Sequence, residues 1–312
     1  SLSVDNGLAL MQVEDALLDS SDGLVLTRRR IWFHFQRFSW DLDRKENNPC
    51  HGEEYRQVTR RLAKRLPDAI HAQVLKGEFH LGIAPHMLSY YHLITDLLPH
   101  LIMQQRFPVL VPEWLSSGFR SFLEECGFAL CVLPPGDYRV ESLHIPAMPD
   151  EDWNTVKVQA VRDFVRERFN LRSFRRPEKT RVYISRRRAG RRHLANEDTL
   201  LPLFKERGYQ TMLLEKWSVR QQIDLFSNVT HLVAPHGAGL INAVFSPPEA
   251  RILEIRPVVS SGDYCFDSLF SCGWSRHEVL VPRKRGRFEV SPDLLKRVLD
   301  RWENTASMNG MA

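Results

Sequence analysis

The carboxyl-terminal half of the chain alternates between short apolar segments and amphipathic segments of helical length. The apolar segments are typical of buried strands, and the segments between them have helical periodicity. The expected strands comprise residues 181–185, 209–214, 231–234, 251–255 and 277–281. A last helix is expected at residues 292–304. Strands that are joined by helices predict an α/β fold with a parallel sheet covered on both faces.

The amino-terminal half is less regular and reads as irregular β-structure followed by α/β structure. Its periodicity changes from alternation to helical spacing several times. The expected elements are strands at residues 31–35 and 79–84, a helix at 55–66, and a βαβ unit at 109–133.

A break in this pattern predicts a boundary between two domains. Pro146 and the acidic residues 150–152 indicate a linker, and a basic helix at 156–169 follows it. A chain of 312 residues is long enough for two domains with separate cores. We expect α/β domains at residues 1–150 and 151–312, with a cleft between them. The last helix could pack back on the first domain.

A glycine-rich turn joins the expected strand 231–234 to a helix, in the sequence Val-Ala-Pro-His-Gly-Ala-Gly-Leu-Ile-Asn-Ala-Val-Phe at residues 233–245. Gly237 and Gly239 allow a ligand to approach the backbone closely. The N–H groups at a helix start near Ala238 would stabilise an anion. The turn therefore predicts a cradle for a phosphate or diphosphate.

Known glycine motifs do not explain this turn. No Gly-Lys-Ser/Thr follows the glycines, and the third glycine of the dinucleotide fingerprint is missing. The chain also contains no Gly-x-Ser-x-Gly nucleophile elbow. Tight packing of a helix on the sheet remains an alternative reason for the glycines.

An arginine-rich loop follows the expected strand 181–185. Five arginines lie within residues 186–192. The planar guanidinium group matches phosphate oxygens and stays charged at any relevant pH. A solvated basic turn or a nucleic-acid patch would have the same composition. However, ligands gather at the carboxyl ends of parallel strands, and both loops are expected there.

Three blocks of the sequence, taken in order, resemble the family 61 glycosyltransferases. The first is Tyr-His-Leu-Ile-Thr-Asp-Leu-Leu-Pro at residues 91–99. The second is Tyr-Ile-Ser-Arg at 183–186, with Arg-Arg-His at 191–193 and Asn-Glu at 196–197. The third is Pro-His-Gly-Ala-Gly-Leu-Ile-Asn at 235–242, with Ile-Leu-Glu-Ile at 252–255. The resemblance covers roughly residues 80 to 275.

The resemblance implies two Rossmann-like domains that face a central cleft (the GT-B architecture), inversion at the anomeric carbon, and no metal or other cofactor. It makes residues 1–150 the acceptor side and residues 151–312 the domain for a nucleotide-sugar, by default a UDP-sugar. Residues expected to bind the donor or its diphosphate are Ser185, Arg186, Arg191, Arg192, Asn196, His236, Gly237, Ala238, Gly239, Asn242 and Glu254.

Alternative roles remain open for several of these residues. His236 could simply hold the turn, and Asn242 could cap it. Asn196 and Glu197 are typical of a helix start, where side chains cap backbone N–H groups. The resemblance places Glu254 near the ribose or the sugar.

The charge that develops on the departing diphosphate must be neutralised. Arg186, with Arg191 or Arg192 and the helix start at Ala238, could supply positive charge. The Asp-x-Asp patterns at residues 41–43 and 150–152 resemble metal-binding motifs, but such short matches are frequent by chance. We therefore expect metal-independent activity.

An inverting transfer also needs a general base for the acceptor hydroxyl. His92 and Asp96 are four residues apart and would share one face of a helix. Either could accept the proton while the other orients it, or the two could form an ordinary surface pair. The resemblance favours Asp96 as the base, with His92 second. His86 and His100 flank the segment and are expected to be incidental.

Composition leaves two further functions open. The isoelectric point near 9.0 would suit a nucleic-acid-binding α/β protein, but a net charge of +5 over 312 residues is modest. Stacking platforms for bases are largely absent among the arginines. A sugar-nucleotide binder without turnover is the other alternative.

The expected setting is a cell interior. Five scattered cysteines without a Cys-x-x-Cys pair favour a reducing compartment. No apolar run approaches the roughly 18 residues of a membrane span, and the first residues lack a signal-peptide core. We expect a cytoplasmic enzyme of surface polysaccharide synthesis, in peripheral contact with an anionic membrane. Its partners would be the donor and a glycan or lipid-linked glycan acceptor, with no nucleic acid.

Overall fold

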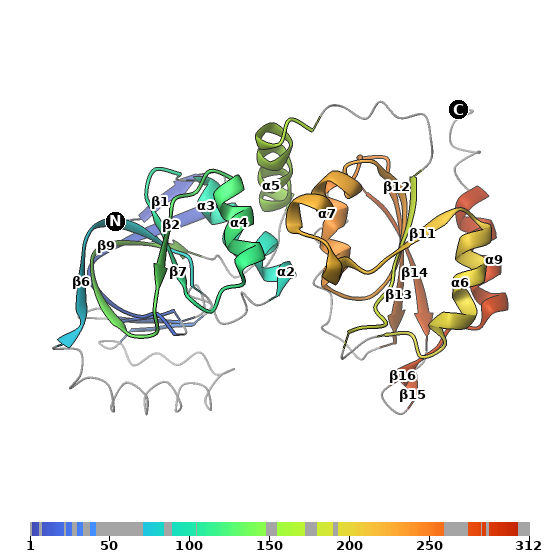
Figure 1. The fold of residues 1–312 in the computed structure, drawn as a ribbon, viewed down its shortest axis with the longest axis horizontal. Coiled ribbons are helices and arrows are strands. Elements are labelled where there is room, and N and C mark those ends of the chain that lie inside the picture. Colours follow the sequence, from blue (N-terminus) through green and yellow to red (C-terminus); the bar gives the residue numbers. More distant parts are fainter. Residues whose placement is uncertain are drawn as a thin grey trace. The chain divides into compact units, whose positions relative to one another are not determined.

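The computed structural model divides the chain into two compact units, Ser1–Val161 and Arg162–Ala312 (Figure 1). The residues that it describes are 2–5, 8–21, 23–26, 30–33, 38–41, 71–83, 89–103, 105–147, 155–171, 180–189, 193–258, 274–281, 283–284 and 287–304. The division falls within helix α5 (Thr155–Arg168). The boundary expected at residues 150 and 151 lies outside the described residues.

The amino-terminal unit contains a mixed sheet. Its order is β5-β4-β3-β2-β9-β6-β7-β8, and β1 pairs with β2. In this order, the neighbouring strands β5, β4, β3, β2 and β9 pair antiparallel. The neighbouring strands β9, β6, β7 and β8 pair parallel. The antiparallel half differs from a doubly wound parallel sheet. The strands are β1 (Leu2–Asp5), β2 (Leu8–Asp19), β3 (Leu24–Leu26), β4 (Arg30–Phe33), β5 (Phe38–Asp41), β6 (Gln73–Leu81), β7 (Val109–Pro112), β8 (Leu130–Leu133) and β9 (Asp137–Ala147).

Strand β9 extends through Pro146, which we expected to belong to a linker. Pro146 pairs with Leu10 of β2. On the other side, the pairing of β9 with β6 ends at His144 and His80. Proline is tolerated where its missing N–H does not interrupt a ladder. The linker expected from Pro146 onward is therefore shorter, and its remaining residues lie outside the described ranges.

The helices of this unit follow the parallel half of the sheet. Strand β7, helix α4 (Ser117–Glu125) and strand β8 form the expected βαβ unit. The Ser116 side chain caps α4 by accepting from the Phe119 N–H. Before them, α2 (Tyr90–His92), the π-helix η3 (Leu93–Leu97) and α3 (Leu98–Met103) form one helical segment. The helix expected at residues 55–66 lies outside the described residues.

The carboxyl-terminal unit contains the expected parallel sheet. Its order is β11-β10-β12-β13-β14, and every neighbouring pair is parallel. All five strands that the sequence predicts are confirmed within a few residues. The strands are β10 (Thr180–Ile184), β11 (Tyr209–Met212), β12 (Val229–Pro235), β13 (Arg251–Pro257) and β14 (Ser275–Val281).

Helices cover both faces of this sheet, with α6 and α9 on one face and α7 on the other (Figure 1). A short hairpin joins β15 (Arg283–Lys284) to β16 (Arg287–Phe288) before the last helix. The helical elements are α6 (Glu197–Glu206), η4 (Leu214–Lys216), α7 (Val219–Phe226), η5 (Ala238–Phe245) and α9 (Pro292–Asn304).

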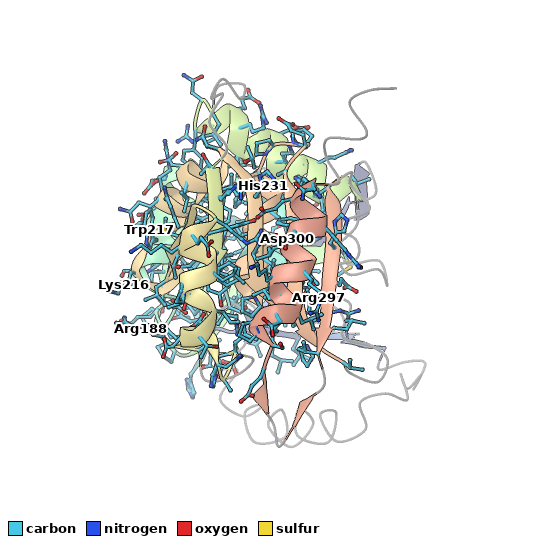
Figure 2. The ribbon with its side chains drawn as sticks, turned by 90° about the vertical axis from the view of Figure 1, so that its right-hand side faces the viewer. Arg188, Lys216, Trp217, His231, Arg297 and Asp300 are labelled. Atoms are coloured by element: carbon cyan, nitrogen blue, oxygen red, sulfur yellow. The ribbon has the colours of Figure 1, made fainter. Side chains whose placement is uncertain are left out.

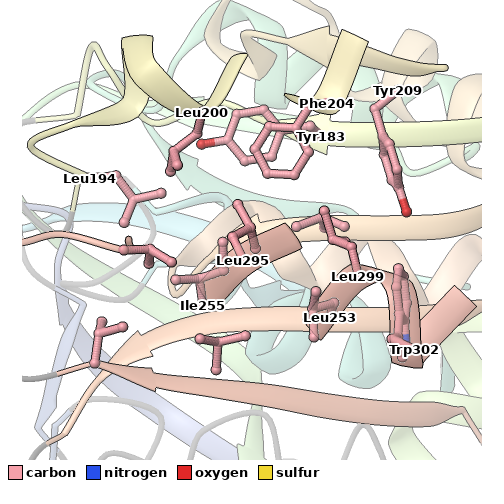
Figure 3. Close-up of a cluster of buried hydrophobic side chains, with 14 residues drawn as sticks. Tyr183, Leu194, Leu200, Phe204, Tyr209, Leu253, Ile255, Leu295, Leu299 and Trp302 are labelled. Atoms are coloured by element: carbon pink, nitrogen blue, oxygen red, sulfur yellow. The ribbon is translucent and has the colours of Figure 1, made fainter. Parts of the chain in front are cut away.

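The last helix packs on the core of its own unit. Its buried residues Leu295, Leu299 and Trp302 join the cluster that contains Tyr183 and Phe204 (Figure 3). The rings of Tyr183 and Phe204 stack at 4.1 Å between centroids. The apolar face of α9 is thus buried within the carboxyl-terminal unit.

Candidate active site

The arginine-rich loop and the glycine-rich loop meet at one edge of the carboxyl-terminal sheet. Strands β10 and β12 are neighbours in parallel, so both loops leave from carboxyl ends. A Cβ atom added at Gly237 would lie 1.9 Å from Nη1 of Arg186 and 2.3 Å from its Cζ. The Arg186 guanidinium therefore lies directly against the Gly237 backbone, in space that any side chain at Gly237 would occupy.

The helical element after the glycines begins at Ala238, as expected, but it is a 3₁₀-helix. Its first turn closes when Leu240 N–H donates to the Gly237 carbonyl at 2.9 Å. A Cβ atom at Gly239 would meet Leu214 Cδ1 at 3.1 Å and Ile184 Cγ2 at 3.4 Å. Gly239 thus serves tight packing of η5 on the sheet, while Gly237 makes room for Arg186.

Asn242 lies inside the protein and ties η5 to its neighbours. Its side chain is completely buried, and Nδ2 donates to Gln222 Oε1 at 2.9 Å and to the Gly239 carbonyl at 3.1 Å. Gln222 in turn donates to the carbonyls of Leu214 and Trp217. Asn242 therefore fixes the glycine-rich loop against α7 and η4.

His236, which directly follows β12, and Glu254, which lies in the middle of the adjacent strand β13, form a buried pair. His236 Nδ1 lies 2.5 Å from Glu254 Oε1, with exposures of 6% and 0% for the two side chains. The His236 backbone N–H also donates to the Ile255 carbonyl at 2.8 Å. Glu254, which the resemblance places near the ribose or the sugar, contacts His236 and sets which ring nitrogen faces away from it.

The loop after β10 is organised around Glu197, whose importance the sequence did not reveal. Tyr183 donates its hydroxyl hydrogen to Glu197 Oε1 at 2.6 Å, and Ser185 donates to Oε2 at 3.0 Å. Arg187 Nε donates to the same carboxylate at 3.4 Å. The sequence hints at Glu197 through its place at a helix start and through the Asn-Glu pair at 196–197 that resembles the family. Arg191 and Arg192 lie outside the described residues.

Asn196 occupies the start of α6, but its side chain makes no capping hydrogen bond there. Nδ2 donates to the Val290 carbonyl at 2.7 Å, and Oδ1 accepts from the Val290 N–H at 3.2 Å. The expected side-chain cap is therefore wrong, because the amide instead pairs with the backbone of a distant segment.

Three labelled side chains lie on one side of the carboxyl-terminal unit. Figure 2 shows Arg188, Lys216 and Trp217 in one row. Arg188 follows β10, whereas Lys216 and Trp217 follow β11. Two basic residues and one aromatic residue thus lie on this side of the unit.

The amino-terminal unit holds the predicted His92 and Asp96 pair. His92 Nδ1 lies 2.6 Å from Asp96 Oδ2, and the two side chains are 28% and 26% exposed. Thr95 donates its hydroxyl hydrogen to Asp96 Oδ1 at 2.6 Å. Both carboxylate oxygens are therefore engaged. The pair lies where the helical segment becomes a π-helix, a rare element that is frequent at functional sites.

The surroundings of Asp96 keep its carboxylate ionised. Burial raises the pKa of Asp96, but hydrogen bonds from His92 and Thr95 and the positive charge of Lys157 outweigh burial and leave the pKa below its ordinary value. Lys157, in α5, is completely buried. Because Asp96 is ionised, His92 Nδ1 donates the hydrogen in this pair.

His100 lies in the interior, although we expected it to be incidental. It is completely buried, and its Nδ1 donates to the Asp96 carbonyl at 2.7 Å. Its Nε2 has no hydrogen-bond partner within the described part of the chain. Burial, and then the charge of Lys157, lower the pKa of His100 to about 4, against the opposing effect of Asp96. His80 also lowers this pKa.

Acidification is expected to destabilise the protein through His100. Between its ordinary pKa of 6.5 and about 4, the unfolded chain binds a proton that the folded state excludes. The free energy of unfolding should therefore fall as the pH drops through this window, by up to about 3 kcal/mol. Urea unfolding of the wild type and His100→Gln at several pH values measures the effect. Equal pH dependence of both proteins would contradict it.

The described ranges contain neither a cluster of metal ligands nor a membrane-spanning helix. No group of three His, Cys, Asp or Glu side chains there is arranged to hold a metal ion. Asp41 ends β5, whereas Asp43 and residues 150–152 of the two Asp-x-Asp patterns are not described. None of the helices within these ranges is both long and apolar enough to cross a membrane.

Among known proteins, the chain matches one family. No curated protein matches the chain. The family model described as Glycosyltransferase 61 matches residues 90–253, which are more than half of the chain. The match begins at the helical segment of His92 and Asp96 and ends just before Glu254. It therefore includes the contact of Arg186 with Gly237, and the chain belongs to glycosyltransferase family 61.

Proposed function

We propose that this enzyme is an inverting, metal-independent glycosyltransferase that moves a sugar from a nucleoside diphosphate to a hydroxyl of a glycan acceptor. The observation that carries the proposal is the Arg186 guanidinium against the Gly237 backbone. A permanent cation and a closely approachable backbone meet there at the carboxyl end of a parallel sheet, where ligands of α/β proteins bind.

On the donor side, the departing diphosphate must be stabilised by positive charge. When the bond between the anomeric carbon and the diphosphate oxygen breaks, its electron pair stays on the diphosphate. Arg186 and the backbone N–H groups at the start of η5 would stabilise that charge. His236, held by Glu254, lies next to Gly237 and would contact the same anion. We propose Arg191 and Arg192 as further cations, on the sequence alone.

On the acceptor side, the hydrogen bonds favour His92 as the base and Asp96 as its orienting partner. A carboxylate with a lowered pKa and two engaged oxygens is a weak proton acceptor. With Nδ1–H bound to Asp96, the acceptor nitrogen of a neutral His92 is Nε2. This order reverses the one that the resemblance favours.

The proposed step is a single displacement. The acceptor oxygen forms a bond to the anomeric carbon, its proton passes to His92 Nε2, and the nucleoside diphosphate leaves from the opposite face. A cytoplasmic setting at the membrane, a UDP-sugar and a surface polysaccharide product belong to the same proposal. They rest on the resemblance, the cysteine pattern and the basic composition.

Activity is expected to persist in EDTA. Release of nucleoside diphosphate from UDP-, GDP- and CDP-sugars would be measured with a panel of glycoside acceptors, in EDTA and in excess Mg²⁺. The arginine account predicts equal rates for one donor under both conditions, and a product whose anomeric configuration, determined by NMR, is inverted. Turnover that requires the metal, or retention of configuration, would contradict it.

A further inference from the structure

We infer that Glu197 is a positioning residue of the donor site, because it engages Arg187 and thereby leaves the adjacent Arg186 directed at Gly237. This inference rests on the proposed function of Arg186 as a ligand of the donor diphosphate. It assigns different tasks to two neighbouring arginines. Arg187 neutralises acidic side chains of the protein, and Arg186 neutralises the diphosphate of the substrate.

Glu197 is built into the core of the loop. It is 5% exposed, and its Oε1 accepts from the Tyr183 hydroxyl at 2.6 Å while Oε2 accepts from the Ser185 hydroxyl at 3.0 Å. Tyr183 lies in β10, and Ser185 directly follows that strand, just before the arginines. These bonds fix the point from which the arginine loop leaves the sheet.

Arg187 completes this arrangement. Its Nε lies 3.4 Å from Glu197 Oε2, and its Nη2 lies 2.5 Å from Asp198 Oδ1. Two carboxylates at the start of α6 thus hold one guanidinium group. Arg186 takes the other direction, toward the Gly237 backbone. A nearly buried carboxylate with a missing partner would be costly, so Glu197 requires a cation nearby.

The two arginines are therefore in competition. If Arg187 is removed, Arg186 is the adjacent cation on the same loop, and Glu197 and Asp198 attract it away from Gly237. Donor affinity should then fall, although Arg187 itself points to protein carboxylates. Removing the charge of Glu197 as well should relieve that attraction. The two residues are thus expected to be energetically coupled in donor binding.

The test is a double-mutant cycle on nucleotide affinity. The wild type, Arg187→Met, Glu197→Gln and the double variant would be titrated with UDP, GDP and CDP by calorimetry in EDTA. Arg187→Met is expected to weaken binding of the preferred nucleotide about 10-fold, about 1.4 kcal/mol. The double variant should bind more tightly than Arg187→Met alone. Single effects that add without coupling, or unchanged affinity in Arg187→Met, would overturn the inference.

Controls separate positioning from a structural role. Arg188→Met removes an exposed arginine of the same loop and should change nucleotide affinity less than 3-fold. Arg187 is 43% exposed, so Arg187→Met should fold even if Glu197→Gln does not, and its affinity then tests whether the bonds of Arg187 to Glu197 and Asp198 keep Arg186 at the donor site. In the transfer assay, Arg187→Met should raise the donor KM without changing the acceptor KM.

A lower melting temperature with unchanged donor affinity would show that Glu197 and Arg187 are structural only. Failure of the proposed function looks different. In that case the wild type binds none of the three nucleotides, and Arg186→Ala behaves like the wild type. The inference would then be overturned together with its premise.

Discussion

Replacing His92 with glutamine is expected to lower the turnover number for sugar transfer by roughly 10²- to 10⁴-fold, which corresponds to about 3 to 5 kcal/mol. The glutamine amide can still donate to Asp96 Oδ2, but it cannot accept the proton of an acceptor hydroxyl. Donor affinity should remain within 3-fold, about 0.6 kcal/mol, because the donor residues belong to the other unit. Initial rates at saturating donor, with calorimetry of the nucleotide, measure both.

Two comparisons decide between His92 and Asp96. Added imidazole should restore part of the activity of His92→Ala, because it supplies the missing acceptor. Asp96→Asn should also lose activity, because the amide no longer fixes the Nδ1–H of His92, but imidazole should not restore it. If His92→Gln stays within a few-fold of the wild type while Asp96→Asn is inactive, Asp96 is the base.

The second large effect concerns Arg186. Arg186→Ala is expected to lower kcat/KM for the donor by roughly 10²- to 10³-fold, comparable to the loss of a main electrostatic stabiliser in other enzymes. The loss should appear in both kcat and nucleotide affinity, because the guanidinium would contact the diphosphate before and after the bond breaks. Steady-state kinetics with varied donor at fixed acceptor measure it.

The matched control for this variant is Arg188→Ala, which removes an exposed arginine two residues away. It should change kcat/KM by less than 3-fold, about 0.6 kcal/mol. Equal losses in the two variants would mean that only the general basic charge of the loop matters. A wild-type rate in Arg186→Ala would remove Arg186 from the site.

The carboxyl-terminal sheet could be predicted because its signals are local. Each strand is a short apolar run next to a helical pattern. That alternation predicts that the strands of the sheet are parallel. The expected contact between the two loops also follows, because strands β10 and β12 end at the same edge. The role of Gly237 as space for Arg186 needed coordinates, since glycine alone does not say what approaches it.

The features that escaped prediction depend on residues far apart in the chain. The long pairing of β2 with β9 joins residues near 10 to residues near 145, and no local pattern indicates it. Burial of Lys157 and His100 is equally nonlocal, because both residue types are usually exposed or intermediate. Glu197 looked like a helix start, and its three donors lie on an earlier segment.

The choice between His92 and Asp96 as the base depends on contacts that the sequence does not show. Spacing placed the two residues on one helical face, and the hydrogen bond at 2.6 Å agrees with that spacing. The sequence could not show that Thr95 occupies the second carboxylate oxygen or that Lys157 is buried nearby. Those contacts keep Asp96 ionised until the pH falls below its ordinary range near 3.9, which suits an orienting partner.

The most direct test of the metal-free donor site is calorimetric titration of the wild type and Arg186→Ala with UDP, GDP and CDP in EDTA. The account predicts that one nucleotide binds the wild type at micromolar concentration and that Arg186→Ala loses this binding. Binding that requires Mg²⁺, equal binding by the two proteins, or no binding of any nucleotide would contradict the account.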